Sequence, residues 1–278
     1  MQIITRLLIL KVYNNISIMN KSDSSYKYIY GPVSSWRLGN SLGVDLISKK
    51  EKTCTFDCAY CQIGKTEDFL DQRKIFVKTK DVLKEINLVE AGNIDYITFS
   101  GKGEPTLASN LGDVIEGIRK IRHEKIAIIT NTSLIDRPDV QQDLKLADIV
   151  MIKIDACNED LFLKINRPMK DMRLKNMIEG IKEFRSSYKG KIALQIMFVE
   201  DNKKYAQEFA KIAKDISPNE VDINTPLRPS PVKPLSKKGI DLILPYFKGQ
   251  NAISVYDSYR KPITPLSTKD TLKRRGSL

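Results

Sequence analysis

Two patterns of hydrophobic and polar positions alternate along this chain from residue 41 onward. Short runs of β-branched and apolar residues predict strands. The longer segments between them place apolar residues three or four positions apart and predict amphipathic helices. The predicted strands are 41–47, 94–100, 125–131, 148–155, 191–199 and 220–224, and the predicted helices are 79–92, 110–122, 139–147, 171–187 and 203–216. Strands that alternate with helices in this way predict a parallel α/β sheet, either open or curled into a barrel.

The alternation inside single strands favours the barrel. In the fourth predicted strand Val150, Ile152 and Ile154 share one face, whereas Met151, Lys153 and Asp155 share the other. An open sheet covered by helices on both faces has continuously hydrophobic strands. One apolar and one polar face per strand instead predicts helices outside and a wet lumen inside. We therefore expect a partial (β/α)6 TIM-like barrel with a short C-terminal extension.

The chain changes character on both sides of this predicted core. We expect an N-terminal extension over residues 1–27, a core barrel over 28–226 and a C-terminal segment over 227–278. The C-terminal segment begins with a proline-rich linker, continues with a predicted helix (239–247) and a predicted strand (252–257), and ends in the basic sequence TLKRRGSL. We expect that basic tail to be mobile.

Composition narrows the range of partners and compartments. No apolar run approaches the roughly 20 residues that span a bilayer, so we expect no membrane contact, and the clustered cysteines discussed below favour the cytoplasm. The net charge is +12, from 46 basic and 34 acidic residues. Such an excess favours phosphate-rich partners such as RNA. A solvated lysine-rich surface with no such partner would carry the same net charge.

Three of the four cysteines lie in one stretch, CTFDCAYCQIG, as Cys54, Cys58 and Cys61. Clustering of this kind does not suit a disulfide framework and favours a reducing compartment. Three thiolates on a tight loop can bind three irons of a [4Fe–4S] cube and leave the fourth iron without a protein ligand. A structural zinc site needs a fourth ligand, which would have to be His123 or Cys157.

The C-x3-C-x2-C spacing, with an aromatic residue before the last cysteine, resembles the signature of the radical S-adenosylmethionine (SAM) superfamily. The strings YGPVSSWRLGNSLGVDL, FSGKGEPTL, KINRP and INTPLRP resemble the branch that contains the wyosine-base synthases of transfer RNA, over about residues 28–275. The resemblance implies a partial barrel, a [4Fe–4S] cluster and SAM as cofactors, and an enzyme that generates a 5′-deoxyadenosyl radical to abstract hydrogen from its substrate.

The resemblance also implies roles for single residues. Cys54, Cys58 and Cys61 would bind the cluster, and Tyr60 would belong to the cofactor site. Gly103 would let the backbone approach SAM, and Glu104 would accept a hydrogen bond from its ammonium group. The further SAM-binding candidates, at the ends of the third and fourth predicted strands, are Asn131 and Asp155. The competing interpretations are an ordinary turn at 101–104 and helix caps at the two strand ends.

Lys153 is the candidate catalytic residue. A lysine on the inner face of a barrel strand requires a carboxylate partner or a substrate. It would either form a salt bridge with Asp155 or Asp222, or anchor a substrate, or supply an amine for carbonyl chemistry. Cys157, just past the same strand, is interpreted as a small buried hydrophobe.

The substrate stays open at this stage. The wyosine-base synthases carry a second cluster on three N-terminal cysteines, and residues 1–53 contain no cysteine. We consider a radical enzyme acting on a tRNA base, a radical enzyme acting on a protein or small molecule, and a noncatalytic iron–sulfur protein. An external one-electron donor of the flavodoxin or ferredoxin type is expected. RNA binding would use basic residues after the last core strand, namely Arg228, Lys233, Lys237, Lys238, Lys273, Arg274 and Arg275.

Overall fold

The six predicted strands form the centre of one sheet in the computed structural model, which describes residues 26–90, 92–260 and 262–275. Each of the six runs parallel to its neighbour, which confirms the predicted parallel arrangement. They are β2 (Gly39–Val44), β5 (Tyr96–Phe99), β6 (Lys125–Thr130), β7 (Ile149–Lys153), β8 (Lys191–Met197) and β9 (Glu220–Asn224).

Two further strands extend the sheet at its edges. β10 (Ala252–Ser254) pairs parallel with β9 and lies inside a predicted strand. β1 (Ile29–Ser35) pairs antiparallel with β2 and was not predicted, because Gly31 and Pro32 interrupt its pattern. Proline is tolerated on an edge strand, where no ladder partner requires its missing N–H. The strand order is β1-β2-β5-β6-β7-β8-β9-β10, so the curled sheet of the described chain stays open between β1 and β10.

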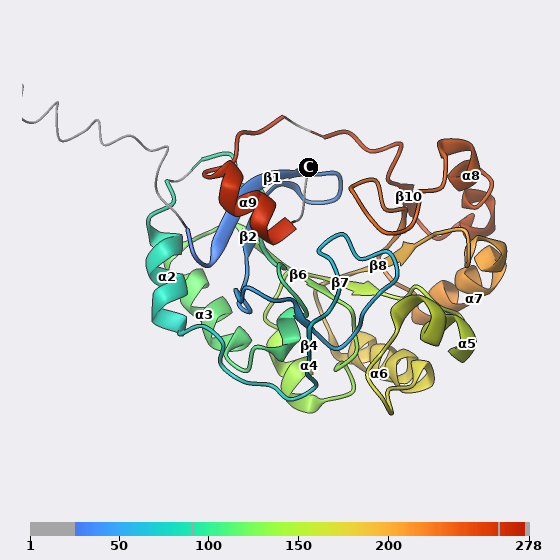
Figure 1. Ribbon diagram of the computed structural model, residues 1–278, viewed down its shortest axis with the longest axis horizontal. Coiled ribbons are helices and arrows are strands. Elements are labelled where there is room, and N and C mark those ends of the chain that lie inside the picture. Colours follow the sequence, from blue (N-terminus) through green and yellow to red (C-terminus); the bar gives the residue numbers. More distant parts are fainter. Residues whose placement is uncertain (1–25, 91, 261, 276–278) are drawn as a thin grey trace, which may run out of the picture.

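The principal helices lie on the outer side of the curled sheet, from α2 through α4 and α6 to α7 (Figure 1). This is the predicted partial barrel. These helices are α2 (Thr79–Asn87), α3 (Leu111–Ile121), α4 (Pro138–Leu144), α6 (Leu174–Ser187) and α7 (Ala206–Ile216), and the remaining ones are α5 (Glu159–Leu161), α8 (Lys237–Asp241) and α9 (Thr268–Arg275).

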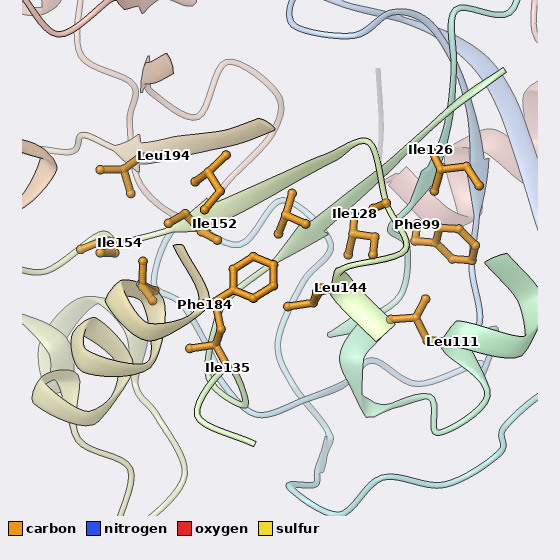
Figure 2. Packing of buried hydrophobic residues seen from close by; sticks show 14 of the residues in the cluster. Phe99, Leu111, Ile126, Ile128, Ile135, Leu144, Ile152, Ile154, Phe184 and Leu194 are labelled. Carbon is orange, nitrogen blue, oxygen red and sulfur yellow. The ribbon is translucent and has the colours of Figure 1, made fainter. Parts of the chain in front are cut away.

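The largest hydrophobic core fills the layer between the sheet and these helices. Val150, Ile152 and Ile154 of the fourth predicted strand all belong to it, as the alternation pattern predicted. Figure 2 shows Ile152 on the same side as Phe184 of α6 and Leu144 of α4. Burial of a side chain of this size contributes about 1.5–3 kcal/mol, so this layer carries much of the stability of the fold.

The lumen is polar in only part of its length. Leu38, Ala127, Ile149, Met151 and Ala193 form a separate buried cluster on the inner face of the sheet. All but Leu38 lie in the first half or at the midpoint of their strands and therefore close one end of the barrel. The prediction of a wet lumen holds at the other end, where the strands finish and where α/β barrels place their active sites.

The C-terminal segment crosses the open side of the barrel and ends in α9, which lies against β1 (Figure 1). The expectation of a mobile basic tail is wrong for residues up to Arg275. The Arg274 side chain is only 3% exposed and lies 3.8 Å from Asp45 and 3.9 Å from Asp270. It also donates a hydrogen bond of 3.0 Å to the carbonyl of Tyr26. A buried guanidinium with carboxylate partners holds the helix in place, because unpaired burial of that charge would be costly.

Most of the predicted N-terminal extension, residues 1–25, lies outside the described part of the chain. Among the helices of the described residues, none is both long enough and apolar enough to cross a membrane.

Candidate active site

The cysteine loop lies at the carboxyl ends of the barrel strands and is fixed on two sides by backbone hydrogen bonds. On one side Thr53 N–H donates to Lys102 O at 3.1 Å. On the other, Ala59 N–H donates to Ile165 O at 2.8 Å, and a tight turn follows in which Cys61 N–H donates to Cys58 O at 2.9 Å. The loop is therefore clamped between the glycine-rich turn after β5 and the segment after β7.

All three cysteines of the loop line one cavity of about 270 Å³. Asn131 Nδ2 lies 3.5 Å from Cys54 Sγ, and Asn166 Nδ2 lies 3.6 Å from Cys58 Sγ. Burial raises the pKa of Cys54 to about 12 against the opposing effect of Lys52, so a metal that binds this sulfur must displace its proton. Thiols with amide donors beside them suit an iron–sulfur cluster, whose sulfurs accept such hydrogen bonds.

The ligand geometry does not suit a single zinc ion. Within the described residues no three His, Cys, Asp or Glu side chains converge as the ligands of one ion must. His123 precedes β6 and so lies at the opposite end of the barrel from the cysteine loop. Cys157 does not line the cavity; its thiol pKa is raised to about 11, by burial and then by Glu208. The three thiols of the loop share one cavity, as the ligands of a single cluster must.

Gly103 brings two parts of the protein backbone together. A Cβ atom built at Gly103 would lie 1.7 Å from the carbonyl oxygen of Thr53, the residue before the first loop cysteine. The Glu104 N–H donates to that same carbonyl at 3.3 Å. The glycine was expected to let the backbone approach SAM, but the close approach seen here is to the cysteine loop itself.

Glu104 is buried at the cavity wall and accepts several hydrogen bonds from the protein. Its Oε1 accepts from the backbone N–H of Thr106 at 3.1 Å and from the hydroxyls of Thr106 and Thr130, each at 2.7 Å. Its Oε2 accepts from the Asn131 N–H at 2.7 Å. Burial raises the pKa of the Glu104 carboxyl, against the opposing effect of these donors. One oxygen is thus fully used, whereas Oε2 keeps capacity for a second donor.

Tyr60, Lys153, Asp155 and Asn166 form one polar cluster. Tyr60 donates its hydroxyl hydrogen to Asp155, and Lys153 Nζ donates to the same hydroxyl oxygen at 2.9 Å. Lys153 Nζ lies 3.8 Å from Asp155 Oδ2, and Asn166 Nδ2 donates to that oxygen at 3.3 Å. Burial raises the Tyr60 pKa well above its usual value, and nearby Asp155 raises it further, so the hydroxyl stays a donor.

The predicted site residues thus separate into two groups. Tyr60, Gly103, Glu104, Asn131 and Lys153 line the cavity together with the three cysteines. Asp155 does not line it; its Oδ1 accepts from the Met197 N–H at 2.8 Å, and its other oxygen belongs to the polar cluster. The salt bridge considered for Lys153 therefore involves Asp155 and not Asp222, which lies 3.8 Å from Arg37.

Sequence reasoning missed several residues of this site. Asn166 contacts both Cys58 and Asp155, and the only signal for it was its position inside the string KINRP. It closes the π-helical turn η3 (Phe162–Asn166), and such turns occur frequently at functional sites. Lys52 also lines the cavity, and its pKa is raised because the adjacent Cys61 and Cys54 sulfurs outweigh the effect of burial.

A partial α/β barrel with a three-cysteine loop at the carboxyl ends of its strands defines the radical SAM class of fold and site. The protein-family model described as "Radical SAM superfamily" matches residues 52–214 of this chain. The chain therefore belongs to the radical SAM superfamily, and it is an enzyme that uses a [4Fe–4S] cluster and SAM. Enzymes of this superfamily need an external electron donor.

The chain is also similar to two UPF0026 proteins and to one solved structure. A UPF0026 protein of Synechocystis is 37% identical over 212 residues, which cover 76% of this chain and 80% of the relative. A UPF0026 protein of Methanocaldococcus jannaschii is 39% identical over 222 residues, covering 77% of this chain and 68% of the relative. Streptococcus suis SuiB, in its crystal structure with bound SAM, superposes with a TM-score of 0.60 at 13% identity, over 78% of this chain and 50% of that one. The last comparison bears on the fold alone.

Proposed function

We propose that this protein uses Cys54, Cys58 and Cys61 to bind its [4Fe–4S] cluster and the adjoining cavity to bind SAM. The observation that carries the proposal is the placement of all three thiols on one cavity wall at the carboxyl end of the barrel. When bound, the cluster and SAM supply a 5′-deoxyadenosyl radical that removes a hydrogen atom from the substrate. The protein's part is to bind, orient and shield these groups.

We assign SAM binding to Glu104, which keeps acceptor capacity on Oε2, and to Asn131, which lines the same cavity. Glu104 Oε2 accepts the ammonium group, and the Asn131 amide, held between Thr55 at 2.7 Å and Cys54, lies beside the same wall. Gly103 acts indirectly, because it lets the cysteine loop approach the glycine-rich turn. Asp155 also acts indirectly, through Tyr60 and Asn166, and is a positioning residue in this proposal.

Lys153 is proposed as the residue that contacts the substrate. Its ammonium group is fixed by Tyr60 and Asp155 while its side chain, 17% exposed, lines the cavity. Burial alone would lower its pKa, but Asp155 and the loop cysteines outweigh that effect and raise it. The group is thus a cation, suited to a carbonyl or anionic oxygen of the substrate, and it is not poised as a free amine for Schiff-base formation.

For the substrate class we propose a base of transfer RNA. Support comes from the +12 net charge and from exposed Lys233, Lys237, Lys238 and Lys273 in the C-terminal segment. Arg274, first expected to join them, is buried against Asp45 and drops out of that surface. An enzyme that acts on a base must extrude it from its stack, and the open side of the barrel between β1 and β10 is the place where a base could enter.

The test is anaerobic incubation of the reconstituted enzyme with dithionite and SAM, with and without bulk tRNA. We expect tRNA to increase 5′-deoxyadenosine formation and to bind more tightly than heparin at near-physiological salt. Equal affinity for tRNA and heparin, with no gain in 5′-deoxyadenosine, would remove RNA from the proposal.

One observation favours a second candidate, a small anionic molecule. The open side of the barrel holds a further cavity of about 510 Å³, and residues of the C-terminal strap (255–260 and 262–267) line it. The strap is held by a hydrogen bond of 2.6 Å from Leu266 N–H to Gly31 O. A chamber covered by the chain is easier for a small molecule to enter than for a folded RNA. A screen of phosphorylated metabolites in the same assay would distinguish the two substrate classes.

A further inference from the structure

Two cavities of this protein share a wall. The cysteine cavity, and the larger cavity under the C-terminal strap that we call the lateral cavity, have several lining residues in common. These are Val33, Ser35, Arg37, Gln62, Asn224, Arg228 and Arg275. Arg37, Arg228 and Arg275, which we call the arginine wall, come from the β1–β2 turn, the segment after β9 and α9. Three distant parts of the chain thus bring positive charges to the boundary between the two cavities.

The guanidinium groups of this wall are incompletely satisfied by the protein. Arg37 Nε and Nη1 are buried and have no hydrogen-bond partner among the described residues. The nearest carboxylate oxygen, Asp222 Oδ2, is 3.8 Å from Nη1, which is too long for a hydrogen bond. Buried donors without partners cost free energy, so a ligand that accepts from Arg37 would be stabilised.

Arg228 and Arg275 have a still larger excess of positive charge. Arg228 donates from Nη2 to Gln62 Oε1 at 2.8 Å and from Nη1 to the Arg275 carbonyl oxygen. In the described chain neither side chain has a carboxylate at salt-bridge distance. The Arg228 pKa is lowered to about 10, by burial and then by the positive charge of Arg275. An anion placed here would stabilise the charged guanidinium groups and so oppose both effects.

The charge balance favours a phosphate over a carboxylate. Asp222 offsets Arg37 in part, which leaves the positive charges of Arg228 and Arg275 without a carboxylate partner among the described residues. A phosphate monoester carries about −1.5 to −2 charges near neutral pH, whereas a carboxylate carries one. The planar guanidinium fork also binds phosphate oxygens in pairs.

We infer that Arg37, Arg228 and Arg275 bind the phosphate group of the substrate at the boundary between the lateral cavity and the cysteine cavity. The inference rests on the proposed function only in taking the ligand to be the substrate. A phosphate fixed at this wall leaves the rest of the molecule free to extend toward the cysteines and Lys153, which line the same cavity. The phosphate belongs either to a small phosphorylated molecule or to a nucleotide of RNA.

The first measurement is calorimetric binding of ribose 5-phosphate and of ribose to the reconstituted full-length protein without reductant. We expect ribose 5-phosphate to bind and ribose not to bind. Arg228→Gln and Arg275→Gln should each weaken binding by about tenfold or more, the usual loss for a hydrogen bond to a charged group. Lys214→Gln is the matched control, because it removes one positive charge from an exposed position on α7, away from both cavities.

Folding effects are separated by conservative variants. Arg228→Lys and Arg275→Lys keep the charge but lose the paired donors, so they should bind ribose 5-phosphate with intermediate affinity and melt near the wild-type temperature. Wild-type affinity in the glutamine variants, equal binding of ribose and ribose 5-phosphate, or displacement of the sugar phosphate by SAM would overturn the inference. Displacement would mean that the wall binds the carboxylate of the cofactor.

A second arm identifies the source of the phosphate. If RNA supplies it, ribose 5-phosphate competes with a tRNA transcript and the arginine variants weaken both ligands. If a small molecule supplies the phosphate, the arginine variants should bind tRNA with the wild-type affinity. Because these are binding measurements, they can succeed when tRNA fails to stimulate 5′-deoxyadenosine formation, so failure of the proposed function and failure of the arginine wall give different results.

Discussion

The Tyr60 hydroxyl donates a hydrogen bond to the buried carboxylate of Asp155, which joins the cysteine loop to the end of β7. The bond links residues 95 positions apart in the sequence. It holds the aromatic residue of the cysteine motif against the barrel while Lys153 contacts the same hydroxyl from the cavity side. The position before the last cysteine is therefore a structural anchor as well as a part of the cavity wall.

Tyr60→Phe should lower the free energy of unfolding by about 1–3 kcal/mol, the cost of removing a donor from a buried acceptor. Iron content after reconstitution should stay at the wild-type level, because the three cysteines are unchanged. Urea unfolding measures the first quantity and iron analysis the second. Tyr246→Phe, at a position 53% exposed, is the control and should change neither. Wild-type stability in Tyr60→Phe would show that the hydroxyl contributes nothing net.

Alanine at any one of Cys54, Cys58 and Cys61 should abolish the cluster. Wild-type protein reconstituted anaerobically should contain about four irons per chain, and each variant should lose the visible absorption of the cluster. Cys157→Ala is the matched control, since Cys157 does not line the cavity. A triple-alanine protein with the wild-type spectrum would contradict the ligand assignment.

Gly103→Ala should disrupt the cysteine loop although it alters no ligand. The added methyl group would meet the Thr53 carbonyl oxygen at 1.7 Å, so the backbone before Cys54 must move. We expect reduced iron incorporation together with lower stability. Gly92→Ala is the control, because nothing lies within 4 Å of its added methyl group. Full iron incorporation in Gly103→Ala would show that the loop accommodates the shift without loss of the site.

Local patterns in the sequence were enough to predict the barrel and to single out the cysteine loop. Each core strand buries one face in a single contiguous layer. The alternation of apolar and polar residues therefore places Ile152 and Lys153 on opposite sides of the sheet, even when the neighbouring strands are unknown. The cysteine motif is equally local. Both signals are complete within a few residues, and the structure and the superfamily match agree with the fold predicted from them.

The parts that could not be predicted depend on contacts between distant segments. The basic sequence around Arg274 has the composition of a mobile tail, and only the position of Asp45 across the fold makes it a buried anchor. Likewise Arg37 and Arg228 are ordinary polar residues in their own segments and form one wall only after the barrel has curled. No periodic pattern in the sequence predicts these contacts between distant segments.

Asn166→Ala should lower the reduction potential of the cluster. The Asn166 amide lies 3.6 Å from Cys58 Sγ, and a hydrogen bond to a cluster sulfur stabilises the more negative, reduced state. Loss of one such bond, worth about 0.5–1.5 kcal/mol, corresponds to about 20–60 mV for one electron. A redox titration followed by electron paramagnetic resonance gives the value. Asn87→Ala, at an exposed position at the end of α2, is the control. A potential equal to wild type would mean that Asn166 acts only through Asp155.

Asp222→Asn should change how stability depends on pH. The Asp222 carboxyl lies fully buried on β9, and burial raises its pKa to about 7, against the opposing charge of Arg37 and with a smaller upward contribution from Glu220. Because the folded state holds this proton more tightly than the unfolded chain, the contribution of Asp222 to stability is fully present below about pH 4, the unfolded pKa. It is lost as pH rises toward and through 7.

The wild-type free energy of unfolding should therefore fall more steeply than that of Asp222→Asn between pH 5 and 8, as measured by urea unfolding across that range. Glu116→Gln, at an exposed position on α3, should follow the wild-type profile. Parallel profiles for wild type and Asp222→Asn would show that Arg37 keeps the carboxylate ionised throughout, and would make the pair a neutral element of the arginine wall at every pH tested.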